Sequence, residues 1–437
     1  MEFPDAETIA QVLDPIEFPQ FLDVEYDPET LRLRDVEGTA RAEAERLLDG
    51  GTTGVPAGGT ITIGLGSRGV TDIVPIARAT IEAVRSRGYE PVVVPAMGSH
   101  GGATAAGQIE TLAGLGLTEE SLDCAIDARM ATVKLGDESG PGGEPVPVHI
   151  ARAAHEADGI LVINRVKPHT NFEGRFESGL TKMLAVGLGK QRGARAIHER
   201  ALSAGYVPAI EDALAAIRRE VAVIGGLAVV ENRREEVATI EAVGGTDLPE
   251  GKEALLDRAR QRMPTLPFDA LDCVVVARIG KDVSGTGMDT NVIGRYRVLN
   301  ADEPAIPEIK RICVLGLTEA THGNGMGIGL ADVTTRAVAA DLDLEQVYAN
   351  ALTSSSLAKA SVPVVLPSEE TAVTAALSSV GPYDPEAIEV CWIRDTSHLS
   401  SFRVSAALAD RLPADAEITG RSRLSFETGE PTFERVK

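Results

Sequence analysis

Short apolar runs alternate with amphipathic stretches through the first half of the chain. The runs at residues 60–66, 90–96 and 159–165 ("TITIGLG", "EPVVVPA" and "GILVINR") are almost continuously apolar and predict buried strands. Stretches with the apolar spacing of helices lie around these runs, at residues 36–49, 72–88, 104–116 and 206–220. Buried strands that alternate with helices predict a doubly wound, mainly parallel sheet.

The second half repeats this alternation after a proline-containing bend. The bend, "RMPTLPFDALD" at residues 262–272, predicts the boundary between an N-terminal cofactor-binding domain, residues 1–265, and a C-terminal domain, residues 266–437. Beyond it, "DCVVVARIG" and "RICVLGLT" predict strands, and residues 329–350 predict a long helical stretch. The final thirty residues are less regular, and we consider that they pack back onto the first domain. The predicted fold class is α/β, with two α/β domains, mainly parallel sheets and a cofactor and substrate cleft between the domains.

Composition narrows the class of function. The chain has 65 acidic and 42 basic residues, and a net charge of −23 repels nucleic acids and anionic membranes. Only nine of the basic residues are lysines, and an acidic, lysine-poor surface indicates a halophilic source. The sequence contains neither a leader-like segment nor an 18-residue apolar run, so we expect a cytoplasmic protein without a membrane span.

Glycine-rich loops follow the first two predicted strands. In "IGLGSRG", three glycines have the G-x-G-x-x-G spacing, but the second strand ends in "VVVPAMGSH" without the acidic residue of a dinucleotide fold. The loop can hold a mononucleotide phosphate through its N–H groups and Arg68, or it is a simple turn with a solvated arginine. The next loop places His100 at the carboxyl end of a strand, which suits an acid or base.

Lysines gather after the third of these strands. Lys167, Lys182 and Lys190 fall within 24 residues of a chain that otherwise prefers arginine. Lysine, unlike arginine, can lose its proton and form a covalent bond, so this cluster indicates a site that uses an amine. The alternative is that the lysines cluster by chance.

Two histidines, His169 and His198, lie in the same region as the lysines. Glycines between Lys182 and His198 argue against one helix joining them, so we expect these two side chains on separate elements that meet at one ligand.

The remaining histidines and the cysteines give weaker signals. His149 and His155 have the surroundings of structural residues, His322 lies in a glycine-rich loop that we expect to face the cleft, and the role of His398 stays open. The cysteines lie far apart, mostly within apolar runs, and we expect buried thiols at Cys124, Cys273, Cys313 and Cys391.

His100, His169, Lys182 and His198, in this order and in glycine-rich settings, resemble the lactate racemase family, whose members use a nickel-pincer nucleotide. The resemblance is good from about residue 60 to residue 200 and loose in the second domain. It implies that Lys182 tethers the nucleotide, that His198 binds nickel, and that His100 and His169 are the two acid/base groups. It further implies cofactor contacts from the first two loops, at Gly66, Ser67, Arg68 and Gly101.

The activity implied by the resemblance is racemisation or epimerisation of a 2-hydroxy acid. One histidine removes the proton of the 2-hydroxyl while the C2 hydride passes reversibly to the cofactor, which is nickel bound by a pyridinium-3,5-bisthiocarboxylic acid mononucleotide. The implied partners are a small-molecule 2-hydroxy acid and the cofactor-assembly enzymes.

Several positions depart from the family pattern. Leu65 stands where the lactate enzymes have an aspartate, and the segment between His169 and Lys182 is longer by a few residues. In the second domain, "GKDVSGTGMDTNVIGR" has Gly and Thr where those enzymes use Gln and Lys. These departures argue against lactate itself and indicate a larger or more polar substrate. The candidate substrate-binding residues of this domain are Lys281, Asp289, Asn291, Arg295 and His322.

Other classes of function stay open at this stage. One is a divalent-metal-dependent hydrolase or lyase with His100, His169 and His198 around the ion and no organic cofactor. Another is a non-catalytic cofactor-binding or storage protein. A pyridoxal-type Schiff base on Lys182 is a third.

Overall fold

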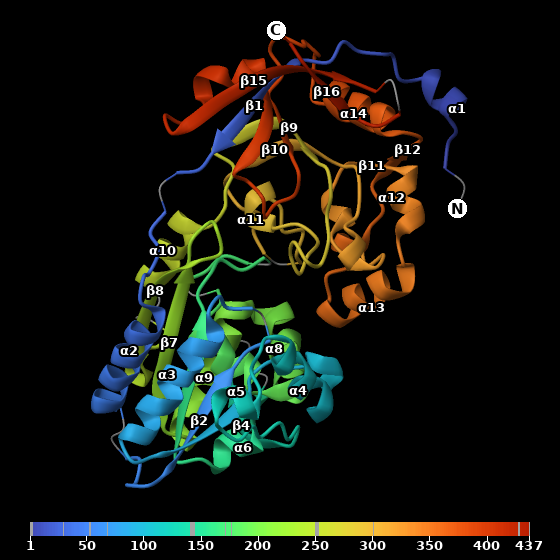
Figure 1. The fold of residues 1–437 in the computed structure, drawn as a ribbon. Helices are drawn as coiled ribbons and strands as arrows, with labels where there is room; N and C mark the ends of the chain where they lie inside the picture. Colours follow the sequence, from blue (N-terminus) through green and yellow to red (C-terminus); the bar gives the residue numbers. More distant parts are fainter. Residues whose placement is uncertain are drawn as a thin grey trace. The chain divides into compact units, whose positions relative to one another are not determined.

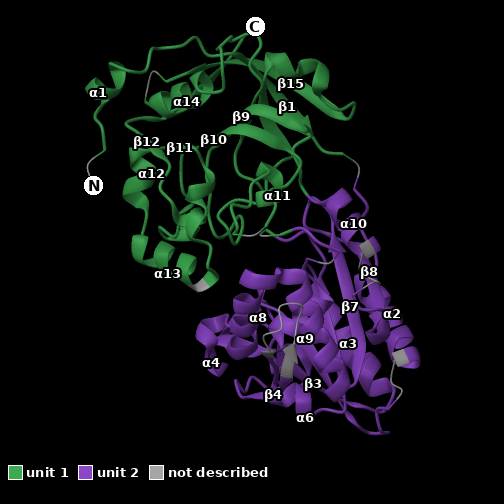
Figure 2. Ribbon diagram, turned by 180° about the vertical axis from the view of Figure 1, so that it is seen from behind, with its two compact units in different colours: residues 1–29, 170–172, 264–437 green, residues 30–169, 173–263 purple. Residues whose placement is uncertain are grey.

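The computed structural model describes residues 3–28, 30–51, 54–67, 69–139, 145–170, 172–175, 177–249, 253–299, 301–426 and 429–436. The chain divides into two compact units. Unit 1 contains residues 1–29, 170–172 and 264–437, and unit 2 contains residues 30–169 and 173–263 (Figure 2).

Unit 2 is built on a five-stranded sheet with the order β3-β2-β6-β7-β8. The first four strands are parallel, and β8 is antiparallel to β7. Their bounds are β2 Thr60–Leu65, β3 Glu90–Pro95, β6 Gly159–Arg165, β7 Val223–Glu231 and β8 Val237–Gly244. The strands expected at 60–66, 90–96 and 159–165 are therefore confirmed.

Helices cover both faces of this sheet (Figure 1). Alternate residues of β6 point to opposite faces, so Leu161 joins the apolar core beneath α2 and α3, whereas Val162 joins the core beneath α9 and α10. A separate hairpin is formed by β4 Thr132–Ser139 and β5 Pro145–Ala151. The helices of unit 2 are α2 Val36–Gly51, α3 Ile73–Ser86, α4 Ala105–Gly114, α5 Glu119–Leu122, α6 Arg152–Glu156, α7 Leu180–Lys182, α8 Lys190–Ala204, α9 Tyr206–Glu220 and α10 Glu253–Arg262.

Unit 1 is built on a nine-stranded sheet with the order β12-β11-β10-β9-β13-β14-β1-β15-β16. The five strands from β12 to β13 are parallel, and those from β14 to β16 extend the sheet in antiparallel pairs. Their bounds are β1 Gln20–Tyr26, β9 Ala270–Val276, β10 Glu308–Val314, β11 Val333–Thr335, β12 Val364–Leu366, β13 Val390–Ile393, β14 Ser401–Ser405, β15 Ala416–Ser425 and β16 Thr432–Arg435. The fold class is thus α/β with mainly parallel sheets, as predicted.

Helical residues also flank the sheet of unit 1. The expected long helix at 329–350 is wrong, because the β-branched run Val333–Thr335 forms β11, and two separate helices follow it. Side chains of Thr335 and Asp343 cap these two helices at their N-termini. The helices of unit 1 are α1 Ala6–Ala10, α11 Thr290–Ile293, α12 Arg336–Asp341, α13 Leu344–Ser354 and α14 Glu369–Ser378.

The division of the chain differs from the sequence-based boundaries at both ends. The first 29 residues belong to unit 1, because β1 pairs with β14 and β15. The final thirty residues also belong there, and they include all of β15 and β16. The change of unit after residue 263 lies close to the expected boundary at residue 265. A cleft between the two domains stays a prediction.

Two further expectations concern the cysteines and the membrane. All four cysteines are free and buried, as expected. In the part of the chain that the structure describes, no helix has both the length and the apolar character needed to cross a bilayer.

Candidate active site

Three loops of unit 2 converge at one edge of its sheet. They follow β2, β3 and β6, which are neighbours in the sheet, and the loops after β2 and β3 contact the segment that joins α7 to α8. The Gly98 N–H donates to the Gly187 carbonyl at 3.0 Å, and the Asn164 amide donates to the Gly179 carbonyl at 3.3 Å. At Gly66, an added Cβ would lie 3.3 Å from the Met183 side chain. The carboxyl ends of parallel strands, where ligands bind in such folds, therefore meet the segment that carries Lys182 and His198.

His100 lies in the second of these loops with an exposed side chain. Its Nδ1 is 2.5 Å from the Ser67 hydroxyl, which links the second loop to the first. The next residue, Gly101, has φ +67°, and an added Cβ would lie 2.5 Å from the Gly107 carbonyl. Only glycine fits this backbone, so the loop holds a tight turn beside the imidazole.

Lys182 ends the short helix α7, and a single π-helical turn, Met183–Gly187, separates it from α8. As expected, no single helix joins Lys182 to His198. The Lys182 ammonium forms a hydrogen bond with Nε2 of His169. An amine and an imidazole thus contact each other at the site edge.

His198, on α8, lies beside Tyr206, the first residue of α9. Nδ1 of His198 is 3.1 Å from the Tyr206 hydroxyl, and the two rings meet edge to face. Burial, and then the nearby charge of Lys182, lower the pKa of His198 to about 4, so the ring is neutral at pH 7. Burial raises the pKa of Tyr206, which therefore keeps its hydroxyl proton.

Tyr206 also lies close to His169, with 6.3 Å between the ring centroids. It therefore joins His169, Lys182 and His198 in one contiguous group. Tyr206 was not predicted from the sequence, because a tyrosine at the start of an amphipathic helix has no recognisable motif. Its place next to His198 depends on how α8 packs against α9.

A buried carboxylate holds the backbone of His169. Glu177, with 0% of its side chain exposed, accepts a hydrogen bond from the His169 N–H at 2.7 Å and another from the Gly174 N–H at 3.1 Å. Arg260 of α10 supplies the positive charge, 2.5 Å from the carboxylate. Burial raises the pKa of Glu177, and the hydrogen bonds and Arg260 oppose this. Glu177 was also missed, because nothing in the sequence distinguishes it from other acidic residues.

Lys190 has a structural position, unlike Lys182. It is 0% exposed, and its ammonium donates to the Pro95 carbonyl and to the Gln108 side chain, both at 2.8 Å. Gln108 in turn donates to the Gly98 and His100 carbonyls at 3.1 Å and 3.4 Å. The lysine cluster in the sequence thus combines a site amine with a lysine that supports the His100 loop.

The other predicted residues have different surroundings. Arg68 lies outside the described residues. Arg295, expected to bind a substrate carboxylate, has its guanidinium bonded to Asp332 at 2.7 Å and to the Leu330 and Ile309 carbonyls at 3.0 Å and 2.8 Å. We therefore leave Arg295 out of the site, because an arginine engaged in this way stabilises the fold of unit 1.

The remaining candidates of unit 1 lie on the loops that follow β9 and β10. The Lys281 ammonium donates to the Gly285 carbonyl at 2.7 Å. Asp289 caps α11 by accepting from the Asn291 N–H at 3.0 Å, and the Asn291 side chain accepts from the Tyr296 hydroxyl. His322 is exposed on a left-handed turn, with φ +47°. Their role in substrate binding stays a prediction.

The surroundings of Lys182 and His198 fit a tethered nucleotide and a metal. An amine lies next to a neutral imidazole, and imidazole is a suitable ligand for nickel. Among the described residues, no three His, Cys, Asp or Glu side chains form a group that could hold a metal ion by themselves.

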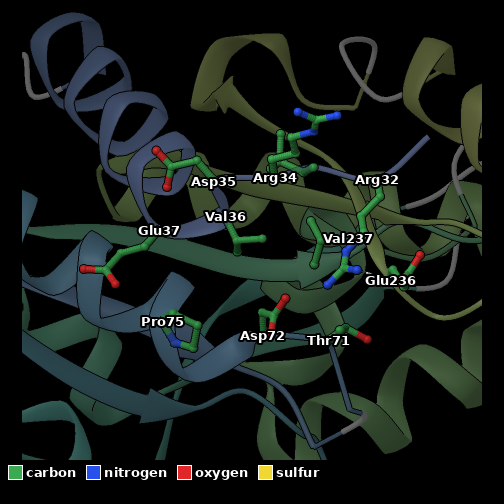
Figure 3. Close-up of a pocket in the computed structure, with 11 residues that line it drawn as sticks. Arg32, Arg34, Asp35, Val36, Glu37, Thr71, Asp72, Pro75, Glu236 and Val237 are labelled. Carbon is green, nitrogen blue, oxygen red and sulfur yellow. Dashed lines mark ion pairs between the residues drawn. The ribbon is translucent and has the colours of Figure 1, made fainter.

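A surface pocket of about 390 Å³ lies elsewhere on unit 2 (Figure 3). Its lining includes the ion pair between Arg32 and Glu236, at 3.2 Å, together with Asp35 and Asp72. Among the residues that the structure describes, none of those predicted for the site lines this pocket, so it is separate from the group around Lys182.

No protein-family model matches the chain, and no curated protein sequence matches it either. Among solved structures, the chain is similar to the lactate racemase apoprotein from Thermoanaerobacterium thermosaccharolyticum. The match has 14% sequence identity and a TM-score of 0.49, and it covers 86% of this chain and 98% of that chain. A likeness this low carries no argument about activity, which has to come from the residues of the site.

Proposed function

We propose that the chain is an isomerase that racemises or epimerises a 2-hydroxy acid with a lysine-tethered nickel-pincer nucleotide. The observation that carries the proposal is the group of Lys182, His169, His198 and Tyr206, in which the Lys182 amine contacts His169, the neutral imidazole of His198 contacts Tyr206, and Tyr206 lies close to His169. The order of these residues in the sequence, with His100 before them, also matches the family pattern.

Lys182 would hold the cofactor covalently, and His198 would bind its metal. When bound, the cofactor supplies a hydride acceptor and donor. His198 suits its role because its ring is neutral at pH 7, and an Nδ1–H that donates to Tyr206 would leave the lone pair of Nε2 for the metal.

His100 and His169 would move the proton of the substrate hydroxyl. An isomerisation that inverts one carbon needs a base in each direction, and each base must return the proton as an acid in the reverse direction. In this chain, the Ser67 hydroxyl orients the ring of His100, and Glu177 fixes the backbone of His169. The Lys182 ammonium contacts His169 here, and acylation of Lys182 would remove that charge and release the ring for proton transfer.

Intact mass and nickel content test the cofactor assignment. The chain is expressed with cofactor-assembly enzymes, as wild type, as Lys182→Ala and as the control Lys310→Ala, which alters an exposed lysine paired with Asp272. We expect a nucleotide-sized mass increment and about one nickel per chain in the wild type and the control, with the covalent increment lost in Lys182→Ala.

Inversion of configuration at C2 tests the activity. The loaded protein is incubated with a panel of 2-hydroxy acids, and inversion at C2 is followed by chiral chromatography. His100→Ala and His169→Ala are expected to lose turnover by about 100-fold or more while retaining the cofactor. Wild-type protein at its bare sequence mass, after the same assembly enzymes have loaded a lactate racemase, would contradict the proposal.

A further inference from the structure

A histidine–aspartate pair lies at the carboxyl end of the parallel strands of unit 1, away from the group around Lys182 in unit 2. It belongs to the loop that follows β13. In the register of β13 with β9, Ile393 pairs with Val276, and the Arg278 N–H continues the pairing by donating to the Arg394 carbonyl at 2.9 Å. The loops after β9 and β13 are therefore adjacent at the edge where open α/β sheets bind ligands.

The carboxylate of Asp395 fixes the imidazole of His398. Its side chain is 4% exposed, and its two oxygens lie 2.8 Å and 2.9 Å from Nδ1 of His398. It also accepts hydrogen bonds from the N–H groups of Ser397 and His398 and from the Ser397 hydroxyl. Burial works to raise the pKa of Asp395, but the bonds from His398 and Ser397 outweigh it and the pKa is lowered, so the carboxylate is ionised at pH 7.

The ring itself is exposed. The His398 side chain is 58% accessible, although the carboxylate behind it is almost completely buried. Because Nδ1 faces Asp395, Nε2 is the ring nitrogen that remains for another molecule. With Nδ1 held by the carboxylate, a protonated ring would donate its Nε2–H to an anion.

The same two loops carry positively charged side chains. Arg278 and Arg394 are exposed, and Lys281 is half-buried on the loop after β9. Two aspartates of the loop after β9 accept hydrogen bonds within unit 1: Asp282 from the Thr318 hydroxyl and Asp289 from the Asn291 N–H. The Asp395 carboxylate also pairs with Arg394, at 3.6 Å. The Asp289 N–H donates to the Thr396 hydroxyl at 2.8 Å, which ties the two loops together.

We propose that the His398–Asp395 pair is a carboxylate-binding site of unit 1 and that its ligand is a small hydroxy acid with two carboxylates. The ring of His398 binds one carboxylate, and the cations on the two loops, Lys281 among them, favour a second negative charge. The hydroxy-acid part of this ligand class rests on the proposed function, whereas the carboxylate site rests on the geometry of the pair.

Histidine NMR spectra of the cofactor-free protein test this site. The imidazole signals of the chain are recorded at constant pH and constant chloride concentration during titration with malate, and separately with lactate. The signals of His398 are assigned by their loss in His398→Gln. We expect a saturable shift of His398 with malate, an affinity for lactate at least about tenfold lower, and a malate affinity reduced about tenfold in His398→Gln.

Two further variants distinguish a specific loss of malate binding from a general loss of protein structure. Asp395→Asn keeps the shape of the side chain but removes the charge behind the ring, and it should weaken malate binding as His398→Gln does. His155→Gln alters a histidine on α6 of unit 2 and should bind malate like the wild type. No shift of His398 at saturating malate, or an unchanged malate affinity in His398→Gln, would overturn the proposal.

The outcomes also separate this site from the proposed function. If malate binds at His398 but the cofactor-loaded protein inverts neither malate nor any other 2-hydroxy acid, the isomerase proposal is contradicted. The carboxylate site is then still supported. Inversion of a 2-hydroxy acid without any malate shift at His398 contradicts the carboxylate site and leaves the isomerase standing.

Discussion

Individual side chains at the proposed site depend on neighbours that take no part in chemistry. The Tyr206 hydroxyl lies within hydrogen-bond distance of His198, and the Ser67 hydroxyl within hydrogen-bond distance of His100. Glu177 accepts a hydrogen bond from the His169 N–H. The histidines and Lys182 could be found from the sequence because glycine-rich loops and an unusual use of lysine surround them. Their supporting residues could not, because a tyrosine or a glutamate acquires such a role only when distant segments pack together.

The Tyr206 hydroxyl should control how firmly His198 holds a metal. Tyr206→Phe removes the hydrogen bond at Nδ1 but keeps the ring, so the imidazole loses its orientation and tautomer preference. We expect nickel to be lost about 10-fold to 100-fold more readily, measured as retained nickel after dialysis against a chelator. Tyr383→Phe removes a hydroxyl of unit 1 that donates to the Glu17 carbonyl, and it should retain nickel like the wild type.

Glu177 should influence the position of His169 through the backbone. Glu177→Ala leaves the His169 N–H without its acceptor, at a cost of about 1–3 kcal/mol, whereas Glu177→Gln retains an acceptor oxygen. We expect kcat to fall in Glu177→Ala with KM little changed, and to recover largely in Glu177→Gln.

The matched control for Glu177 is Glu199→Ala, which breaks an exposed pair with Arg195 on α8. Thermal unfolding of all variants shows whether a loss of kcat follows a loss of folded protein. Equal kcat values in the alanine and glutamine variants of Glu177 would contradict the positioning role.

At the scale of helices and strands, local pattern predicted central parallel strands of both sheets. Continuous apolar runs identify β2, β3 and β6 in unit 2 and β9 and β10 in unit 1, because strands covered on both faces have no polar side. The antiparallel strands were missed because β1, β14 and β15 are brought together from opposite ends of the chain. The short strand β11 was predicted as helix because its three residues lie within a longer apolar stretch. In such a stretch, only the length of the apolar run distinguishes a buried strand from a buried helix.

The buried ammonium of Lys190 joins β3 to α4 and α8, and its burial should appear in the pH dependence of stability. Burial lowers the pKa of Lys190 to about 8 from 10.5, so between these values the unfolded chain binds more protons than the folded chain. The free energy of unfolding of the wild type should therefore rise from pH 8 to pH 10.5 relative to Lys190→Met, by at most about 3 kcal/mol.

Urea unfolding of both proteins across this pH range measures the difference. Lys359, whose pKa burial also lowers to about 8, is present in both proteins, so its contribution cancels. A difference between wild type and Lys190→Met that does not change with pH would contradict the assignment. At pH 7, Lys190→Met should already be less stable, because the Pro95 carbonyl and Gln108 lose their donor.

On the scale of the whole molecule, charge is the dominant feature. A net charge of −23 makes carboxylates repel one another across the surface, and added salt screens this repulsion. If the chain comes from a halophile, its unfolding temperature should rise steadily as KCl is increased from 0.1 M to 2 M. Circular dichroism during heating measures this, and a protein that is soluble and equally stable without added salt would count against a halophilic source.

The place of β1 in the sheet of unit 1 also bears on how the chain is made. β1 precedes unit 2 along the chain, whereas its partners β14 and β15 follow unit 2, and the ion pair between Asp23 and Arg403 spans 380 residues. At ordinary rates of translation, about 5–20 residues per second, β1 waits roughly 20–75 s for a partner. All of unit 2 emerges during that interval and can fold first, so the nascent chain carries an unpaired β1 that chaperones would have to shield until β14 has been made.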